Sequence, residues 1–122
     1  MDIQDFFTAV LTQNAEALRG FFRPDAAVRW HCTNERFTAE EYIRANCEYP
    51  GDWEGELERV ESFGDSIITA ARVWPQDRSA SFHAVSFIKL RGGLIVELDE
   101  YWADDGPAPE WRQAMGIGER IR

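Results

Sequence analysis

The residues with the clearest chemical potential lie near the end of a strand, where a carboxylate interrupts an apolar face. The segment LIVELDEYW, residues 94–102, alternates in the manner of a β-strand. Alternate strand residues share a face, so Leu98, Glu100 and Trp102 point to the same side. A carboxylate among apolar groups is costly to keep ionised, and its pKa is expected to rise toward the range useful for proton transfer. Glu100 is therefore the first candidate for a catalytic base.

A glycine pair brings a histidine into the same neighbourhood. Gly92 and Gly93 separate this strand from a preceding one, and glycine adopts the positive φ values that a two-residue hairpin turn requires. With these two residues as the loop, Glu100 opposes Val85, and His83 projects from the same face one step away. Imidazole titrates near neutral pH, so the pair could supply a base and an acid, or a base and a positioning partner. One extra residue in either strand would move His83 to the opposite face.

The same register divides the other side chains of this hairpin between two faces. Val85, Phe87 and Trp102 are expected to form apolar walls around Glu100. The opposite, outer face is expected to carry Phe82, Ala84, Ser86, Ile88, Asp99 and Tyr101.

A structural role for this pair is the alternative. Glu100 could form an ion pair with Arg72 or Arg112 and hold the sheet or the tail in place. His83 could be a half-buried, hydrogen-bonded histidine. Because structural ion pairs also perturb titration, the residue types alone leave both interpretations open.

Further candidates lie on the first predicted strand and the third predicted helix. Trp30 and Cys32 face inward and are expected to line a core or a cavity. Asn46 shares the inward helix stripe with Tyr42, where its amide could hold a ligand oxygen or tie down a neighbouring loop. A cysteine nucleophile needs an activating base, and His31 points to the other face. No set of residues has the spacing of a metal site, so we expect no metal.

Composition narrows the range of partners. The chain has 122 residues with 13 basic and 22 acidic side chains, a formal net charge of -9. This surface repels phosphate backbones and anionic lipids, so we expect neither nucleic acid nor membrane partners. The acidic start lacks the features of a signal peptide, and two cysteines suit a reducing compartment. We expect a cytoplasmic protein with a single domain over residues 1–122.

Helix signals precede a run of strands along the chain. Asp2, Asn14 and Thr38 are predicted N-caps, the last in a capping box with Glu41, and Pro24 is predicted to end the second helix. Strands are expected at residues 26–32, 53–63, 66–74, 79–91 and 94–102. This order predicts an α+β fold, with N-terminal helices packed on one face of a curved, mostly antiparallel sheet. The C-terminal tail, residues 106–122, has no firm period.

Three segments carry a family resemblance. The succession of DFFTAVLTQNAEALRGFFRPDAAVRWH, FTAEEYI and FIKLRGGLIVELDEYW resembles the nuclear transport factor 2-like superfamily, in its SnoaL-like branch. The resemblance implies a cone-shaped fold, with a strongly curved sheet wrapped around helices and a deep apolar pocket between them. It also implies a homodimer formed through the outer sheet face.

The catalytic groups of such families match this chain unevenly. Steroid isomerases carry an aspartate near the end of the first strand, where this chain has Trp30. Epoxide hydrolases carry a tyrosine and an asparagine that match Trp30 and Cys32, and an arginine with an aspartate where only Arg72 is present. Their last-strand carboxylate corresponds to Glu100. The cyclase-like and dehydratase-like members, which use a pocket carboxylate or histidine, match best.

Two functions follow from these residues. In the first, the protein is a cofactor-independent isomerase, cyclase or lyase, and Glu100 removes a proton next to a carbonyl group of a small apolar substrate. His83 would be the acid or positioning partner, and Asn46 and Tyr42 would donate to the developing oxyanion. In the second, the same pocket belongs to a non-catalytic ligand-binding or dimerisation protein, since fold alone does not determine function. We expect no cofactor in either case.

Overall fold

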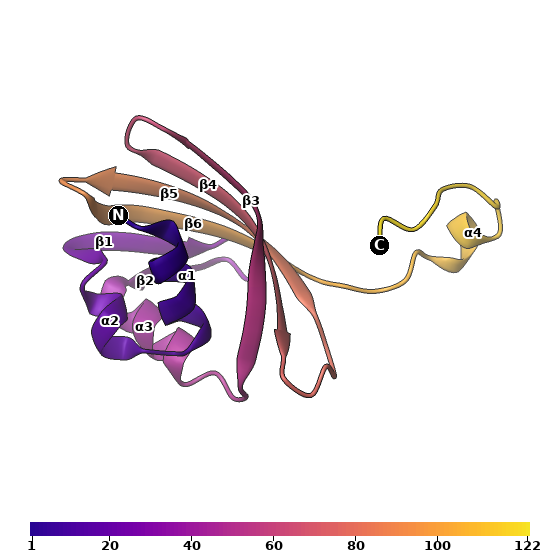
Figure 1. Cartoon of the computed structure of the whole chain (residues 1–122), viewed down its shortest axis with the longest axis horizontal. Coiled ribbons are helices and arrows are strands. Elements are labelled where there is room, and N and C mark those ends of the chain that lie inside the picture. Colours follow the sequence, from indigo (N-terminus) through magenta and orange to yellow (C-terminus); the bar gives the residue numbers. More distant parts are fainter.

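The computed structural model describes residues 1–122 as a helical layer packed on a curved sheet. Helices α1 (Ile3–Leu11), α2 (Ala15–Arg19) and α3 (Ala39–Cys47) lie together on the concave side of the sheet (Figure 1). The predicted α+β class is confirmed. None of the helices has the length and apolar character needed to cross a membrane.

The sheet has six strands in the order β2-β1-β6-β5-β4-β3. Only β1 and β6 run parallel, and every other neighbouring pair is antiparallel, as predicted for a mostly antiparallel sheet. The strands are β1 (Phe22–Trp30), β2 (Glu35–Thr38), β3 (Trp53–Phe63), β4 (Ser66–Pro75), β5 (Phe82–Arg91) and β6 (Leu94–Asp104).

The three predicted N-cap residues cap their helices in the structure. The side chain of Asp2 accepts from the backbone N–H of Asp5 at 3.0 Å, and that of Asn14 accepts from Ala17 at 3.1 Å. Thr38 and Glu41 form the full capping box. These contacts satisfy backbone donors that a helix N-terminus leaves unpaired.

The first strand differs from the prediction at both ends. Helix α2 ends at Arg19, and Pro24 lies inside β1 rather than ending the helix. Pairing of β1 with β6 is irregular between Phe22 and Ala27, so the missing N–H of Pro24 interrupts no regular ladder. Strand β1 ends at Trp30, which leaves Cys32 in an exposed turn before β2, a strand that the sequence did not predict.

The core fills the space between the helices and the concave face. Phe22 lies between Phe6 and Tyr42, with ring centroids 6.0 Å and 5.5 Å away. Tyr42 is only 2% exposed, and Leu98 is completely buried. Burial of these large apolar side chains fixes the helices against β1 and β6.

The predicted register of the β5–β6 hairpin is right at the turn and wrong beyond it. Gly92 and Gly93 have φ values of 58° and 78°, and Arg91 opposes Leu94. The register shifts after the next pair, because Val96 is an extra residue in β6. From Lys89 back to Phe82, this one-residue bulge reverses the face of each β5 side chain relative to the β6 residues that follow Val96.

Several face assignments are therefore corrected. Ser86, and not Val85, opposes Glu100, and Val85 opposes Tyr101. The convex face carries His83, Val85 and Phe87. The prediction that His83 lies beside Glu100 is therefore wrong, and so is the prediction that Val85 and Phe87 form pocket walls. Four residues that were expected on the outer face point inward instead: Phe82, Ala84, Ser86 and Ile88.

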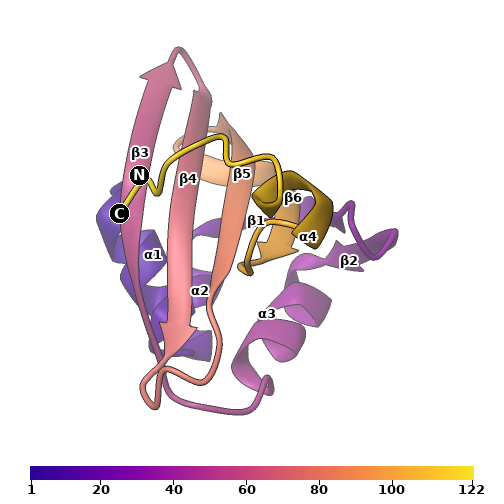
Figure 2. The same cartoon turned by 90° about the vertical axis from the view of Figure 1, so that its right-hand side faces the viewer.

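The segment after β6 leaves the body of the fold. It contains the short helix α4 (Glu110–Gln113), which Figure 1 shows standing apart from the sheet. The chain then returns across the outside of the sheet toward β3 (Figure 2), where the guanidinium of Arg122 pairs with Glu58. Trp111 and Met115 are 65% and 58% exposed, so neither closes the interior of the fold.

Candidate functional site

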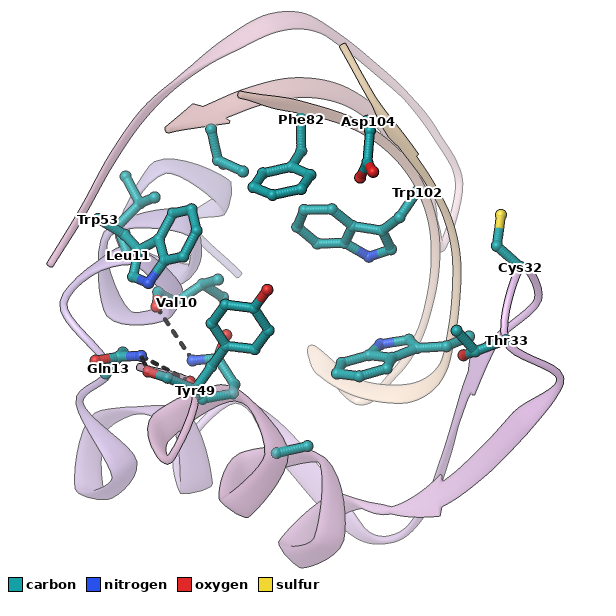
Figure 3. Close-up of a pocket in the computed structure, with 14 residues that line it drawn as sticks. Val10, Leu11, Gln13, Cys32, Thr33, Tyr49, Trp53, Phe82, Trp102 and Asp104 are labelled. Carbon is teal, nitrogen blue, oxygen red and sulfur yellow. Dashed lines mark hydrogen bonds between the residues drawn. The ribbon is translucent and has the colours of Figure 1, made fainter. Parts of the chain in front are cut away.

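A cavity of about 290 Å³ opens between α1, α3 and the concave face of the sheet. Fourteen residues line it and 10 of them are hydrophobic, so the walls are mainly apolar. Figure 3 shows aromatic rings on opposite sides of the open space. The five aromatic residues are Trp30, Tyr49, Trp53, Phe82 and Trp102.

Distant elements bring these rings together. Trp30 is the last residue of β1, and Phe82 and Trp102 point inward from β5 and β6. Tyr49 and Trp53 flank the break after α3, and their ring centroids are 5.4 Å apart. Trp53 also lies 5.8 Å from Phe82. The curvature of the sheet therefore brings aromatic side chains to several sides of the cavity.

The segment between Tyr49 and Trp53 depends on a glycine. Gly51 has a φ of 109°, a region that residues with a Cβ rarely adopt. The indole N–H of Trp53 donates to the carbonyl of Pro50 at 3.2 Å. This turn directs Trp53 back toward the cavity.

Two amides hold α3 against α1 at the opposite wall. Asn46 Nδ2 donates to the carbonyl of Val10 at 3.1 Å. Gln13 Nε2 donates to the carbonyls of Asn46 and Tyr49 at 2.9 Å and 2.7 Å (Figure 3). Of the two roles left open for Asn46, tying down a neighbouring element is therefore present, and its side chain also lines the cavity.

Glu100 lies behind the cavity wall and does not line it. Its side chain is on the concave face, opposite Trp30 of the parallel strand, and the residue is 7% exposed. Oε1 accepts a hydrogen bond from Trp30 Nε1 at 3.1 Å, and Oε2 accepts one from Ser86 Oγ at 2.6 Å. The expected arginine partners are absent, since Arg72 pairs with Glu56 and the Arg112 guanidinium lies over Trp111.

The environment of Glu100 shifts its titration. Burial raises the pKa of the Glu100 carboxyl, and the hydrogen bonds from Ser86 and Trp30 oppose that rise. The Trp102 indole N–H is buried without a hydrogen-bond partner, and its proximity also favours the charged form of the carboxylate. Burial, with a smaller contribution from the negative charge of Glu100, raises the pKa of Tyr42 well above its ordinary value.

His83 belongs to a different cluster on the convex face. Its Nδ1 contacts Asp105, and its Nε2 lies 3.0 Å from a Glu58 oxygen. Arg122 reaches the same Nε2 at 3.4 Å. No imidazole therefore stands beside Glu100, and the expected acid–base pair does not form.

The predicted ligand-binding residues separate into two groups. Trp30, Cys32, Asn46 and Trp102 line the cavity, whereas Tyr42 is part of the core behind it. The lining residues that the sequence did not identify are Val10, Leu11, Gln13, Thr33, Ala45, Tyr49, Trp53, Val73, Phe82 and Asp104. For Tyr49 and Trp53, the available sequence signal was their position as the aromatic first and last residues of the helix-breaking segment YPGDW.

Charge is nearly absent from the cavity walls. Asp104 is the single charged residue among those lining it, and its carboxylate forms no ion pair or hydrogen bond. No group of three or more histidine, cysteine, aspartate and glutamate side chains is placed to hold a metal ion. The site is thus an aromatic cavity with one carboxylate on its wall and another behind it.

The sequence itself matches a family profile over most of the fold. Residues 3–98 match the SnoaL-like domain. The chain belongs to the SnoaL-like domain family. This match and the fold place it in the nuclear transport factor 2-like superfamily, as the resemblance implied. No curated protein matches the chain.

Solved structures share the SnoaL-like fold at low sequence identity. A proposed ketosteroid isomerase from Kribbella flavida is 23% identical, with a TM-score of 0.81 over 98% of this chain and 87% of that one. A proposed SnoaL-like polyketide cyclase from Jannaschia is 17% identical, with a TM-score of 0.68 over 93% and 85%. An LEH-like epoxide hydrolase from M. tuberculosis is 12% identical, with a TM-score of 0.67 over 83% and 79%. These likenesses establish the fold.

Proposed function

We propose that this SnoaL-like protein binds a small, largely apolar molecule in the aromatic cavity. The observation that carries the proposal is a space of about 290 Å³ walled by five aromatic side chains from five separate segments. This volume is close to the lower end of the range for small-molecule sites, about 300–1,000 Å³. Side chains that face open space lack van der Waals contacts on that side. A ligand that fills the cavity restores these contacts and therefore stabilises the folded state.

The scaffold supports the same proposal. The amides of Asn46 and Gln13 are engaged with backbone carbonyls, which keeps α1 and α3 at a fixed separation. The structural neighbours are named as a proposed ketosteroid isomerase, a proposed polyketide cyclase and an epoxide hydrolase, and these names denote activities on small organic molecules. A pre-formed cavity of this kind needs little rearrangement to receive a ligand.

A thermal-shift panel of metabolites tests this function. A ligand that binds only the folded state must raise the melting temperature, by an amount that grows with its concentration. We expect at least one class of small apolar compounds to do so. A panel of broad chemical range in which no compound shifts the transition would contradict the proposal.

Proton transfer by Glu100 is the second candidate function. The observation that favours it is a buried carboxylate of raised pKa lying directly behind two cavity-lining indoles, Trp30 and Trp102. A base of this kind could remove a proton next to a carbonyl group of a bound substrate. Proton removal next to a carbonyl group is one way in which a cofactor-independent isomerase, cyclase or lyase can work.

The observed geometry places a condition on that second function. Both oxygens of Glu100 are engaged, by Ser86 and Trp30, and the residue does not reach the cavity surface. The indole of Trp30 or Trp102 must therefore move before Glu100 can contact a ligand. With a compound identified by the panel, Glu100→Gln should abolish turnover and retain binding if the catalytic function holds. Unchanged turnover in this variant would end it.

We also propose that the protein forms a homodimer through the convex face of the sheet. Val85, Phe87 and Tyr101 lie there at 38%, 45% and 45% exposure, beside the ring of His31 stacked on Tyr101. Aromatic and branched side chains gathered on one sheet face favour contact with another protein surface. A second copy supplies the matching face by symmetry.

A further inference from the structure

We propose that the aromatic cavity is selective for an organic cation, an alkylammonium group that carries apolar substituents. This inference rests on the proposed function, because it names the chemical class of the ligand that the cavity takes. The evidence is the combination of several aromatic rings around one space with a carboxylate on its wall.

The aromatic rings supply the first part of the argument. The π face of an aromatic ring carries partial negative charge, and a cation within about 6 Å of its centroid is attracted to it. Indole is the most effective ring for this contact, and Trp30, Trp53 and Trp102 all line the cavity. Phe82 and Tyr49 add two further rings to the cavity lining (Figure 3). A quaternary or tertiary ammonium group presents apolar methylene and methyl surface to such walls.

The distribution of charge supplies the second part. The cavity walls contain no lysine, arginine or histidine, and Asp104 is their one charged residue. In Figure 3 the Asp104 carboxylate lies next to Trp102 and Phe82. Asp104 is exposed to solvent and its carboxylate forms no ion pair or hydrogen bond within the protein, so it is available to a ligand. An anion in this space would face a carboxylate with no compensating positive side chain.

The buried carboxylate acts in the same direction. Glu100 accepts the indole N–H of Trp30 at 3.1 Å, and a negative acceptor on this N–H increases the electron density of the indole ring. The chain as a whole has a net charge of -9, which attracts cations from solution. Gln13 uses both amide N–H groups on backbone carbonyls, so it offers no donor to an anionic or carbonyl ligand.

A set of matched probes tests the charge preference directly. Choline, its uncharged carbon isostere dimethylbutanol and the anion dimethylbutanoate differ mainly in charge, and isothermal titration at constant ionic strength gives their affinities. We expect choline to bind at least about tenfold more tightly than dimethylbutanol, a ratio equivalent to about 1.4 kcal/mol, which lies between the strengths of an exposed and a fully desolvated cation–π contact. Dimethylbutanoate should bind more weakly than either.

Two variants separate the local carboxylate from the overall charge. Asp104→Asn should reduce the preference for choline to about threefold or less. Asp65→Asn removes the same charge from the exposed β3–β4 turn and should leave the preference unchanged. Equal affinity of wild type for choline and dimethylbutanol would overturn the inference while leaving the ligand-binding proposal intact. The inference would also be overturned if none of the three probes binds, or if Asp104→Asn and Asp65→Asn change the preference for choline equally. The thermal-shift panel of metabolites tests ligand binding independently of these probes.

Discussion

The indole N–H of Trp30 donates a hydrogen bond to Oε1 of Glu100 at 3.1 Å, and this bond joins the cavity wall to a buried carboxylate. Trp30 opposes Glu100 because β1 and β6 run parallel in this register. The second oxygen of Glu100 is held by the hydroxyl of Ser86 at 2.6 Å. The carboxylate therefore stabilises the orientation of one ring of the cavity while remaining behind it.

Trp30→Phe tests this connection, because it keeps an aromatic ring and removes the donor. The variant leaves a buried carboxylate with one hydrogen bond fewer, and bonds to charged groups contribute about 1.5–3 kcal/mol. We expect a loss of about 1–3 kcal/mol in the free energy of unfolding, measured by urea denaturation at neutral pH. Trp53→Phe is the matched control, because its N–H bond to Pro50 is exposed and should contribute less. Equal losses in the two variants would contradict the role of the Trp30–Glu100 bond.

Glu100→Gln tests the cost of burying the carboxylate. The folded-state pKa of Glu100 is raised by burial, so its contribution to stability is fully present below its ordinary value, about 4.3, and is lost as pH rises through the folded-state pKa. The free energy of unfolding of the wild type should fall relative to that of Glu100→Gln as pH rises from about 4.3 through the raised folded-state pKa of Glu100. If the free energies of unfolding of the two proteins depend on pH in the same way, the pKa of Glu100 is not raised by burial.

His83→Asn tests the corrected register. His83 lies on the convex face among Asp105, Glu58 and Arg122, away from the cavity. The substitution should change ligand affinity by no more than about twofold, as for other substitutions remote from a site. The measurement is titration calorimetry with any ligand from the panel. A loss of binding would place the imidazole near the cavity, as the uninterrupted hairpin register predicts.

The hairpin shows where local sequence stops being informative. The helix caps at Asp2, Asn14 and Thr38 were predictable because each depends on contacts within three residues. The bulge at Val96 was not, because an extra strand residue has no sequence signature and is decided by packing on both faces of the sheet.

The cavity residues also divide into those that local sequence predicts and those that depend on the tertiary structure. Trp30 and Trp102 were predicted from alternation within their own strands, Trp30 on the inward face of the first strand and Trp102 on the face of Glu100. Asp104, Phe82 and Trp53 were not, because their convergence depends on the curvature of the sheet and on the corrected register. The sequence therefore predicted the fold class and four of the lining residues, Trp30, Cys32, Asn46 and Trp102, but neither the remaining aromatic rings of the cavity nor its carboxylate.

Phe87→Glu tests the proposed dimer. Phe87 is 45% exposed on the convex face, and a charge there would be desolvated in an interface with a second copy. We expect the wild type to be dimeric by light scattering and this variant to be monomeric. Gln4→Glu adds the same charge on α1, on the opposite side of the sheet, and should remain dimeric. A monomeric wild type would contradict the proposal.

The central claim is that the space between Trp30, Tyr49 and Trp53 holds a ligand, and filling that space with a side chain tests it most directly. Ala45 lines the cavity from α3, and Ala45→Phe places a ring inside it; Ala103→Phe adds the same ring on the exposed face of β6. Titration calorimetry with the tightest compound from the panel should show at least about a tenfold loss of affinity for Ala45→Phe and no change for Ala103→Phe. Undiminished binding by folded Ala45→Phe protein would show that the ligand binds elsewhere and that the cavity is not the site.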